Sequence, residues 1–398
     1  MAPGPGLQST ILPLGFSASG VNCGVRRYRP DLGLIFTEKD CVAAGVFTTN
    51  EFRAAPVLHC QAILPSGSIR ALVTNSGQAN AATGAQGKID NEKMAAAVAK
   101  ELGIEPSQVL TASTGVIGKP LEIEKIEAAV PELVQRATEV ADGFALAILT
   151  TDLVPKSVTT TVKLSGGKIR LTGICKGSGM IHPQMATMIG YLLTDVKLTP
   201  ELAQSLMREA ADVSFNMISV DGDSSTNDSC FLLASGETGI ELANDDDFNK
   251  FKKALIEVSQ FLAKAIASDG EGATKLIEVD LKGSPSLELA RKAARGVTLS
   301  PLVKTAMHGE DPNWGRILSR LGAEGAPMEA LNKMTLKLQG TVLFSNGAPV
   351  AFDRDAVRNL LKTNKVFVEI DLKSGRENAT AWGCDLSKKY VDINTEYS

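Results

Sequence analysis

Apolar residues near the start of the chain come in short runs separated by turn-forming residues, a pattern typical of β-strands. The runs cover residues 33–37, 44–48, 56–60 and 69–75. Further along, residues 157–164 and 168–175 are also strand-like, and Ser165, Gly166 and Gly167 lie between them. Because glycine tolerates the positive φ angles of tight turns, these two runs are predicted to form a β-hairpin.

Apolar positions at spacings of three and four residues predict several helices. One follows Asp90 and ends at Gly103, a residue type that favours the position after a helix. A second begins near Glu122, and Pro131 predicts a break or a restart in it. The clearest pattern predicts a helix over about residues 246–267 that packs one apolar stripe on a sheet. Its apolar positions are Phe248, Phe251, Leu255, Val258, Leu262 and Ile266.

The remaining elements indicate the fold class. Thr199 and Pro200 have the residue types of a helix N-cap and first helical position. Further helices are expected near residues 287–295 and 354–362, and strands near residues 275–282, 335–344 and 366–372. Because strands come in groups and do not alternate strictly with helices, the order predicts an α+β fold of layered sheets rather than a doubly wound parallel sheet.

Composition and charge narrow the range of functions. The 398 residues are 44% hydrophobic and 22% charged, which predicts two or three domain-sized units of an ordinary globular protein. With 41 basic and 45 acidic residues, the net charge of −4 gives no sequence-wide attraction to nucleic acids or anionic membranes, and neither is expected as a partner. The six cysteines include no CxxC pair, and no run approaches the length of a membrane span. We therefore expect a cytoplasmic protein with reduced thiols.

Common metal and cofactor motifs are missing from the sequence. The three histidines form no HExxH zinc motif, and no GxSxG nucleophile elbow is present. Residues 270–275 (GEGATK) begin like a dinucleotide-binding glycine loop, but they end in lysine and follow a predicted helix. These patterns therefore predict neither an HExxH zinc site nor a dinucleotide site at residues 270–275.

The acidic stretch at residues 221–228 (DGDSSTND) has three interpretations. Its alternating oxygen ligands resemble a calcium loop, but Thr226 and Leu232 stand where an EF-hand requires Gly and Glu. The favoured interpretation is a polar turn in which Asp and Ser side chains accept hydrogen bonds from backbone N–H groups. Support of an active site and metal binding are the alternatives.

The most unusual segment covers residues 173–188, where a glycine-rich bend containing Lys176 leads to Ala186 and Thr187. The Thr187 hydroxyl can attack the carbonyl of Ala186, so that the acyl group moves from N to O and water cleaves the ester. The new N-terminal threonine would carry an α-amine with an unperturbed pKa of about 7.7–8.0. Such an amine can act as the general base without a histidine. The alternative is a buried strand entry with bending glycines.

Residues 176–188 resemble the self-processing segment of the ornithine acetyltransferases, also called glutamate N-acetyltransferases. Gln184 is a departure, since the family more often has Asn there. Other segments match in the same order over nearly the whole chain. They are residues 20–24 (GVNCG), 75–80 (NSGQAN), 83–84, 112–118 (ASTGVIG), 150–152 (TTD), 220–228, 269–275 (DGEGATK), 311–316 (DPNWGR), 381–385 (AWGCD) and Asn394. The resemblance implies an Ntn-like αββα sandwich, as in DmpA-like enzymes, with mixed sheets and helices outside.

The resemblance also implies roles for individual residues. Thr187 becomes the nucleophile and new N-terminus when the Ala186–Thr187 bond is cleaved, and Thr114 and Gly115 form the oxyanion hole. The implied substrate-binding residues are Thr151, Lys176, Thr187, Glu271, Asn394 and Ser398. Lys176 and Glu271 offer the charges that an amino-acid substrate requires, although the sequence does not assign either to one end of it.

The implied activity is ping-pong acetyl transfer in arginine biosynthesis. N²-acetyl-L-ornithine acetylates Thr187 and releases ornithine, and L-glutamate then accepts the acetyl group to give N-acetylglutamate. The threonine ester carries the acetyl group, so no metal or organic cofactor is required. Acetyl-CoA as an alternative donor is left open by these residues.

Cleavage implies an α chain of residues 1–186 and a β chain of residues 187–398, the latter including a smaller α/β subdomain at about 280–398. The family implies a heterotetramer of two α and two β chains. A self-processing aminopeptidase, in which water discharges the acyl-enzyme, is the alternative enzyme. A calcium- or phosphate-binding module built on residues 221–228 is the alternative outside catalysis.

Overall fold

The computed structural model describes residues 9–182 and 188–396, which form two compact units. Unit 1 comprises residues 1–177, 184–216 and 223–262, and unit 2 comprises residues 178–183, 217–222 and 263–398. Unit 1 thus contains residues from both sides of the predicted cleavage bond. Cleavage there would give two chains that contribute neighbouring strands to one sheet, since strands on either side of the bond pair directly.

An eight-stranded sheet is the framework of unit 1. The strand order is β4-β3-β2-β9-β7-β6-β5, with β1 paired to β2. The strands are β1 (Phe16–Val21), β2 (Leu32–Phe47), β3 (Ser66–Gln78), β4 (Val109–Val116), β5 (Lys156–Leu164), β6 (Gly167–Lys176), β7 (Ile189–Thr194) and β9 (Ser229–Ala234). The first part of β2 pairs with β1 and β3, and its last part pairs with β9. Strand β2 therefore continues from one half of the sheet into the other.

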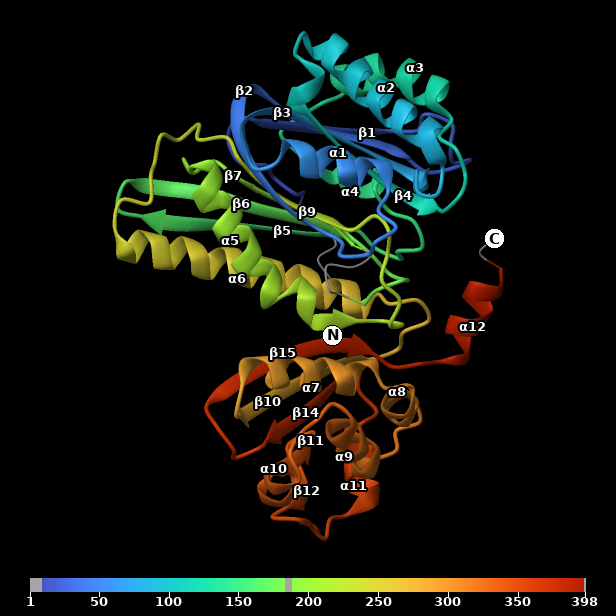
Figure 1. Ribbon diagram of the computed structural model, residues 1–398, viewed down its shortest axis with the longest axis vertical. Helices are drawn as coiled ribbons and strands as arrows, with labels where there is room; N and C mark the ends of the chain where they lie inside the picture. The colour runs from blue at the N-terminus through green and yellow to red at the C-terminus, as the bar shows by residue number, and fades with distance from the viewer. Residues whose placement is uncertain (1–8, 183–187, 397–398) are drawn as a thin grey trace. The chain divides into compact units, whose positions relative to one another are not determined.

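Helices cover both outer faces of the folded sheet. The helices of unit 1 are α1 (Ala55–Ile63), α2 (Gly84–Leu102), α3 (Ile123–Gln135), α4 (Asp142–Ala147), α5 (Pro200–Asp212) and α6 (Asp245–Ser268), with 3₁₀ turns at Pro106–Gln108 and Phe215–Met217. Of these, α1 and α4 contribute side chains to the core between the two halves of the sheet. Helices α2 and α3 pack on the half formed by β1 to β4, and α5 and α6 lie outside the other half (Figure 1). The predicted α+β, αββα arrangement is confirmed.

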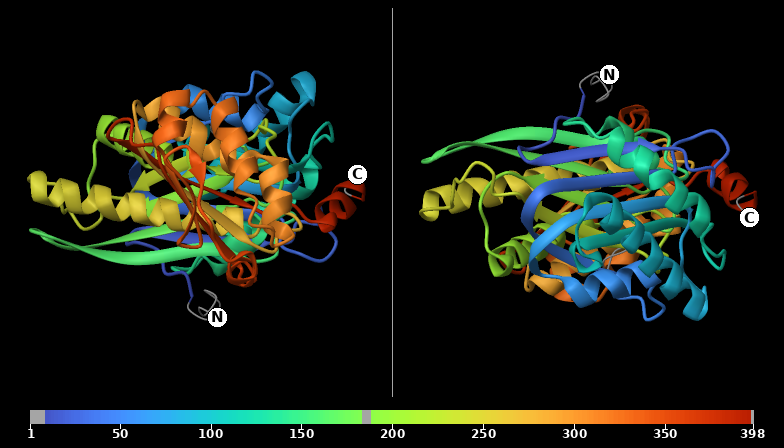
Figure 2. Two further views of the ribbon diagram at one scale, coloured as in Figure 1. Left: turned by 90° about the horizontal axis from the view of Figure 1, so that it is seen from below. Right: turned by 90° about the horizontal axis from the view of Figure 1, so that it is seen from above.

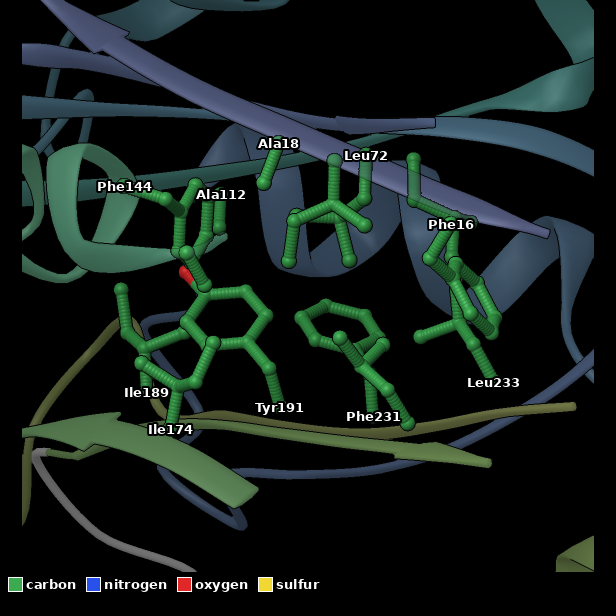
Figure 3. Packing of buried hydrophobic residues seen from close by; sticks show 14 of the residues in the cluster. Phe16, Ala18, Leu72, Ala112, Phe144, Ile174, Ile189, Tyr191, Phe231 and Leu233 are labelled. Carbon is green, nitrogen blue, oxygen red and sulfur yellow. The ribbon is translucent and has the colours of Figure 1, made fainter. Parts of the chain in front are cut away.

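The main core lies between the two halves of the sheet. Phe16 and Leu72 come from the β1 to β4 half and face Tyr191 and Phe231 from the other (Figure 3). Tyr191 contacts the ring of Phe144 edge-on at 4.9 Å between centroids, and its hydroxyl lies 2.8 Å from the Thr74 hydroxyl. The buried phenol thus has a polar partner inside an apolar layer.

Unit 2 contains a seven-stranded sheet in the order β13-β12-β11-β14-β10-β15-β8. The strands are β8 (Ile218–Ser219), β10 (Leu276–Ser284), β11 (Thr335–Leu338), β12 (Thr341–Ser345), β13 (Ala348–Pro349), β14 (Lys365–Asp371) and β15 (Glu377–Cys384). The helices are α7 (Leu287–Leu299), α8 (Pro301–His308), α9 (Trp314–Ala323), α10 (Met328–Lys333), α11 (Arg354–Leu360) and α12 (Lys388–Thr395). Helix α7 packs along β10 and β15, and Figure 2 shows the orange helices beside these strands.

Several predicted elements are confirmed with their caps. The hairpin is β5 and β6, and the long amphipathic helix is α6. The Thr199 hydroxyl accepts a hydrogen bond from the Leu202 N–H at 3.2 Å, and Gly103 adopts φ +65° after α2. All six cysteines are free thiols. Within the described ranges, every helix is too short or too polar to cross a membrane.

Four predictions of secondary structure are wrong. The runs at residues 33–37 and 44–48 are not separate strands, because β2 continues from Leu32 to Phe47. Residues 56–60 belong to α1, because a short apolar run is compatible with either element and Pro56 suits a first helical turn. Residues 335–344 form two strands, since Gln339 and Gly340 turn the chain with positive φ angles. Helix α3 continues through Pro131. The carbonyl that loses its intrahelical donor belongs to exposed Glu127, where water can hydrate it.

Truncation of one core ring tests the packing between the two halves of the sheet. Phe231→Ala should lower the free energy of unfolding by about 3–5 kcal/mol, because it leaves a cavity between them. Tyr28→Ala is the matched control, since Tyr28 is 85% exposed. Urea denaturation measures both, and equal stability of the two variants would contradict the packing described.

Candidate active site

A buried lysine joins two distant strands of unit 1. Lys176 is the last residue of β6 and is 3% exposed. Its Nζ donates hydrogen bonds to Thr114 Oγ1 at 3.1 Å and to Thr150 Oγ1 at 2.9 Å. Thr114 lies on β4, at the far edge of the same sheet. The two residues meet because the sheet folds back on itself, so two residues predicted from separate motifs are brought together.

Thr114 and Gly115 present a hydroxyl and a backbone N–H at the end of β4. Gly115 has φ +133°, and a Cβ there would lie 2.3 Å from the backbone carbon of Gly77, so only glycine fits. Because Thr114 Oγ1 accepts a bond from the Lys176 ammonium, its own hydrogen must point elsewhere, and the cation strengthens it as a donor. Such a pair of donors suits stabilisation of an oxyanion.

A buried carboxylate connects the backbone directly after Lys176 to residues 150–156. Asp152 accepts hydrogen bonds from Lys156 Nζ at 2.7 Å, from the Gly177 N–H at 2.7 Å and from the Thr150 N–H at 3.1 Å. Burial opposes ionisation of Asp152, but the charges of Lys176 and Lys156 together with these hydrogen bonds hold its pKa well below the usual range. Asp152 therefore carries a fixed negative charge next to the lysine.

Thr150 and Asp152 were not among the predicted site residues. Both residues lie in the segment at 150–152 that matches the family, but only Thr151 of that segment was predicted to bind substrate. Thr151 is half-buried in the same segment. The hydroxyl that contacts Lys176 belongs to its neighbour Thr150.

The acidic stretch at residues 221–228 behaves as the polar turn that was predicted. In unit 2, the Asp221 carboxylate accepts hydrogen bonds from the N–H groups of Met180 and Ile181. In unit 1, Ser225 Oγ accepts from the Asn227 N–H at 3.0 Å. The Asn227 amide donates to the Ser113 carbonyl at 2.9 Å and so ties this turn to β4 beside Thr114. Among the described residues, no three His, Cys, Asp or Glu side chains are grouped as metal ligands would be.

Unit 2 holds two more of the predicted residues. Glu271 is 9% exposed, and its Oε2 accepts a hydrogen bond from Asn394 Nδ2 at 2.9 Å. A Cβ at Gly179 would lie 2.3 Å from the Glu271 carboxyl carbon, so the side chain packs directly on that glycine. The Glu271 N–H donates to the Ser178 carbonyl at 3.0 Å. The segment after Lys176 therefore supports Glu271, and Asn394 orients its carboxylate.

Three predicted residues lie outside the described residues. They are Ala186 and Thr187 at the predicted cleavage bond and Ser398 at the end of the chain. Their roles stay predictions. The nearest described residue after the bond is Met188, which precedes β7.

Comparisons with known proteins identify close relatives over almost the full length. The model of the ArgJ family matches residues 17–398. An arginine biosynthesis bifunctional protein ArgJ from Thermotoga neapolitana is 46% identical over 97% of this chain and 99% of its own. The protein of the same name from Dehalococcoides mccartyi is 44% identical over 98% of this chain and 97% of its own. A crystal structure of ArgJ from Bacillus halodurans is 36% identical with a TM-score of 0.50, covering 52% of this chain and 98% of the solved chain.

Loss of the Asp152 charge should destabilise the protein. Asp152→Asn leaves Lys156 buried without its counter-charge, which should lower the free energy of unfolding by about 3–5 kcal/mol at pH 7. Because the pKa of Asp152 is lowered in the folded state, its contribution is complete above an unfolded pKa of about 3.9 and is lost as the pH falls below it. Urea denaturation of both proteins between pH 2 and 7, scanned in steps of about one unit, measures this difference.

Asp246→Asn is the matched control, because Asp246 pairs with Lys250 on the surface. It should leave the free energy of unfolding nearly unchanged. Equal stability of Asp152→Asn and the wild-type protein at pH 7 would contradict the role of Asp152.

Proposed function

This chain belongs to the ArgJ family, and we propose that it transfers an acetyl group from N²-acetyl-L-ornithine to L-glutamate in arginine biosynthesis. The observation that carries the proposal is the 46% identity to a named ArgJ protein over 97% of the chain. The contact between Lys176 and Thr114 adds a physical argument, because it prepares a hydrogen-bond donor for an acyl-transfer intermediate. The alternative aminopeptidase would hydrolyse the acyl-enzyme, which an acetyl-transfer assay distinguishes.

The proposed reaction has two halves that share one acetyl-enzyme. Thr187 Oγ attacks the acetyl carbonyl of acetylornithine while its proton passes to the α-amine of the same residue. The C–N bond then breaks, and the ornithine nitrogen takes that proton as it leaves. Glutamate attacks the resulting ester through its amine in the reverse sequence. Each half passes through a tetrahedral oxyanion, for which Thr114 Oγ1 and the Gly115 N–H are the proposed donors.

The charged residues have different tasks in this proposal. Lys176 is held by two hydroxyls, so its main task is to orient Thr114 and to keep the oxyanion side of the site positive. Glu271 is a carboxylate whose orientation Asn394 fixes, which suits the cationic side chain of ornithine. Thr151 and Ser398 complete the proposed substrate contacts.

The proposal includes self-cleavage between Ala186 and Thr187. The match to the solved Bacillus halodurans chain covers 98% of that chain but only 52% of this one, as expected for one fragment of a divided relative. Strands β6 and β7 pair directly, so the two fragments should stay associated without a covalent link. Assembly of two α and two β chains and a cytoplasmic location belong to the same proposal. No metal or organic cofactor is required, and acetyl-CoA should be assayed as a second donor.

Removal of the nucleophile should abolish both cleavage and transfer. Wild-type protein should separate on a denaturing gel into fragments of 186 residues and 398 − 186 = 212 residues, the second beginning at Thr187 by N-terminal sequencing. Thr187→Ala should remain one band and form no acetylglutamate, whereas Thr187→Ser should retain both reactions. An active wild-type protein that stays as a single intact chain would contradict the mechanism.

Removal of the oxyanion hydroxyl should slow the chemical step. Thr114→Ala should lower kcat by about 10²–10³-fold and change the KM for acetylornithine far less, because the donor acts mainly on the transition state. Thr114→Ser is the matched control, since it keeps the hydroxyl that Lys176 contacts. Steady-state kinetics with acetylornithine and glutamate measure both, and an unchanged kcat in Thr114→Ala would exclude Thr114 from the oxyanion hole.

A further inference from the structure

The loop that carries Glu271 in unit 2 is in direct contact with the last helix of the chain. This loop covers residues 270–275, directly before β10. Ser387 Oγ donates a hydrogen bond to the Gly272 carbonyl at 2.6 Å. Gly272 has φ +70°, and a Cβ there would lie 2.5 Å from the backbone nitrogen of Tyr390. The loop backbone therefore packs on the first turn of α12 so closely that only glycine fits.

Ser387 occupies the N-cap position of α12 but does not cap that helix. An N-cap serine ordinarily accepts a hydrogen bond from a backbone N–H of the first turn. The N-cap side chains of α7, α8, α9 and α11 in the same unit do so; they are Ser286, Ser300, Asn313 and Asp353. The Ser387 side chain makes no such bond with residues 388–395, all of which the structure describes. Its hydroxyl is bonded to the loop that carries Glu271 instead.

Helix α12 is held by polar contacts rather than by an apolar face. It has eight residues, all described and none of them buried. A helix this short is marginal without tertiary contacts. Ser387 contacts Gly272 at the start of the helix, and Asn394 Nδ2 donates to Glu271 Oε2 at 2.9 Å near its end. Because both contacts reach adjacent residues of one loop, the direction of the Glu271 carboxylate depends on where the Ser387 bond places α12.

Asp385 anchors the same two segments at their other end. Its buried carboxylate accepts hydrogen bonds from the Thr274 N–H at 2.7 Å and from the Lys275 N–H at 2.8 Å. The Asp385 N–H donates to the Lys275 carbonyl at 3.1 Å. The chain that leads into α12 is thus fixed to the end of the loop, and Ser387 extends this attachment to the residue next to Glu271.

We propose that Ser387 is a positioning residue for recognition of the cationic side chain of the acetyl donor, an inference that rests on the proposed function. By holding the start of α12 on Gly272, Ser387 keeps the Asn394 amide on Glu271. The Glu271 carboxylate then keeps one orientation towards the side-chain ammonium of ornithine. Ser387 itself contacts no substrate and forms no covalent bond.

The proposed role affects only donors that carry a charged side chain. Without the Ser387 bond, α12 and Asn394 no longer hold Glu271 in one orientation, which weakens its ion pair with the donor. A donor of the same length that lacks the side-chain amine has no ion pair to lose. N²-acetyl-L-norvaline is such a compound, because norvaline is ornithine without its δ-amine.

Ser387→Ala tests the proposal in the full-length protein, with Ser284→Ala as the matched control. Ser284 is also buried in unit 2, and its hydroxyl donates to the Ser286 carbonyl at 2.9 Å, away from the Glu271 loop in sequence. Ser387→Thr keeps the hydroxyl, and Glu271→Gln shows the effect of losing the charge itself. Three quantities are measured for each variant: the KM for N²-acetyl-L-ornithine, the competitive inhibition constant of N²-acetyl-L-norvaline, and the thermal unfolding midpoint.

Ser387→Ala should raise the KM for acetylornithine about three- to tenfold, which is the scale of one hydrogen bond. The inhibition constant of acetylnorvaline should change by less than about twofold, because that compound does not use Glu271. Ser387→Thr should keep the wild-type KM, and Glu271→Gln should raise it more than Ser387→Ala does. Ser284→Ala should lower the unfolding midpoint and change neither constant.

An unchanged KM in Ser387→Ala would overturn the proposal. An equal rise in the KM for acetylornithine and the inhibition constant of acetylnorvaline would also overturn it, because Ser387 would then support the site in general. Ser387→Gly gives the same readouts if the alanine variant does not fold, since glycine is accepted at an N-cap. A Glu271→Gln variant with the wild-type KM would instead refute the role proposed for Glu271, and a wild-type protein that forms no acetylglutamate would refute the proposed function.

Discussion

The course of one strand determines how unit 1 is built. Strand β2 pairs with β1 and β3 along its first part and with β9 along its last part, so a single sheet becomes two facing layers. Residues 38–40 at the change of direction are exposed, whereas the residues before and after them are largely buried. Without this bend, β4 and β6 would lie at distant places in the sheet. With it, Thr114 and Lys176 come within hydrogen-bond distance.

The buried ammonium of Lys176 requires a negative charge and hydrogen-bond acceptors nearby, and the surrounding residues supply both. Burying Lys176 would be costly without compensation, and the carboxylate of Asp152 provides the nearby negative charge while two hydroxyls accept its hydrogen bonds. The same carboxylate binds the Gly177 N–H, which fixes the backbone immediately after the lysine. Asp152 therefore both compensates the charge of Lys176 and fixes the backbone at Gly177, where the chain leaves unit 1. The oxyanion hole proposed at Thr114 and Gly115 would therefore lie beside a lysine whose charge and hydrogen bonds are already compensated.

Local patterns predicted the elements that depend on local chemistry. The β5–β6 hairpin, helix α6 and the caps at Thr199 and Gly103 follow from turn residues and apolar spacing, and all are confirmed. Residues 56–60 were assigned to a strand because five apolar-rich residues do not define a period. The structure shows that helix α1 contains them.

Candidate site residues could be predicted only where they belong to a segment that resembles the family. Thr114, Lys176, Glu271 and Asn394 were chosen from family segments, and the structure brings them together in two pairs. Thr150 and Asp152 were missed because their contact with Lys176 and Gly177 depends on tertiary folding, which residue spacing does not reveal.

The ping-pong reaction depends on a covalent acetyl-enzyme, and trapping this intermediate is the most direct test of it. Purified protein is incubated with N²-acetyl-L-ornithine and no glutamate, then denatured and examined by intact-mass spectrometry. We expect the fragment that begins at Thr187 to gain the mass of one acetyl group on its first residue and to lose it when glutamate is added. Full transferase activity in a protein that never acquires that acetyl group would contradict a ping-pong reaction through Thr187.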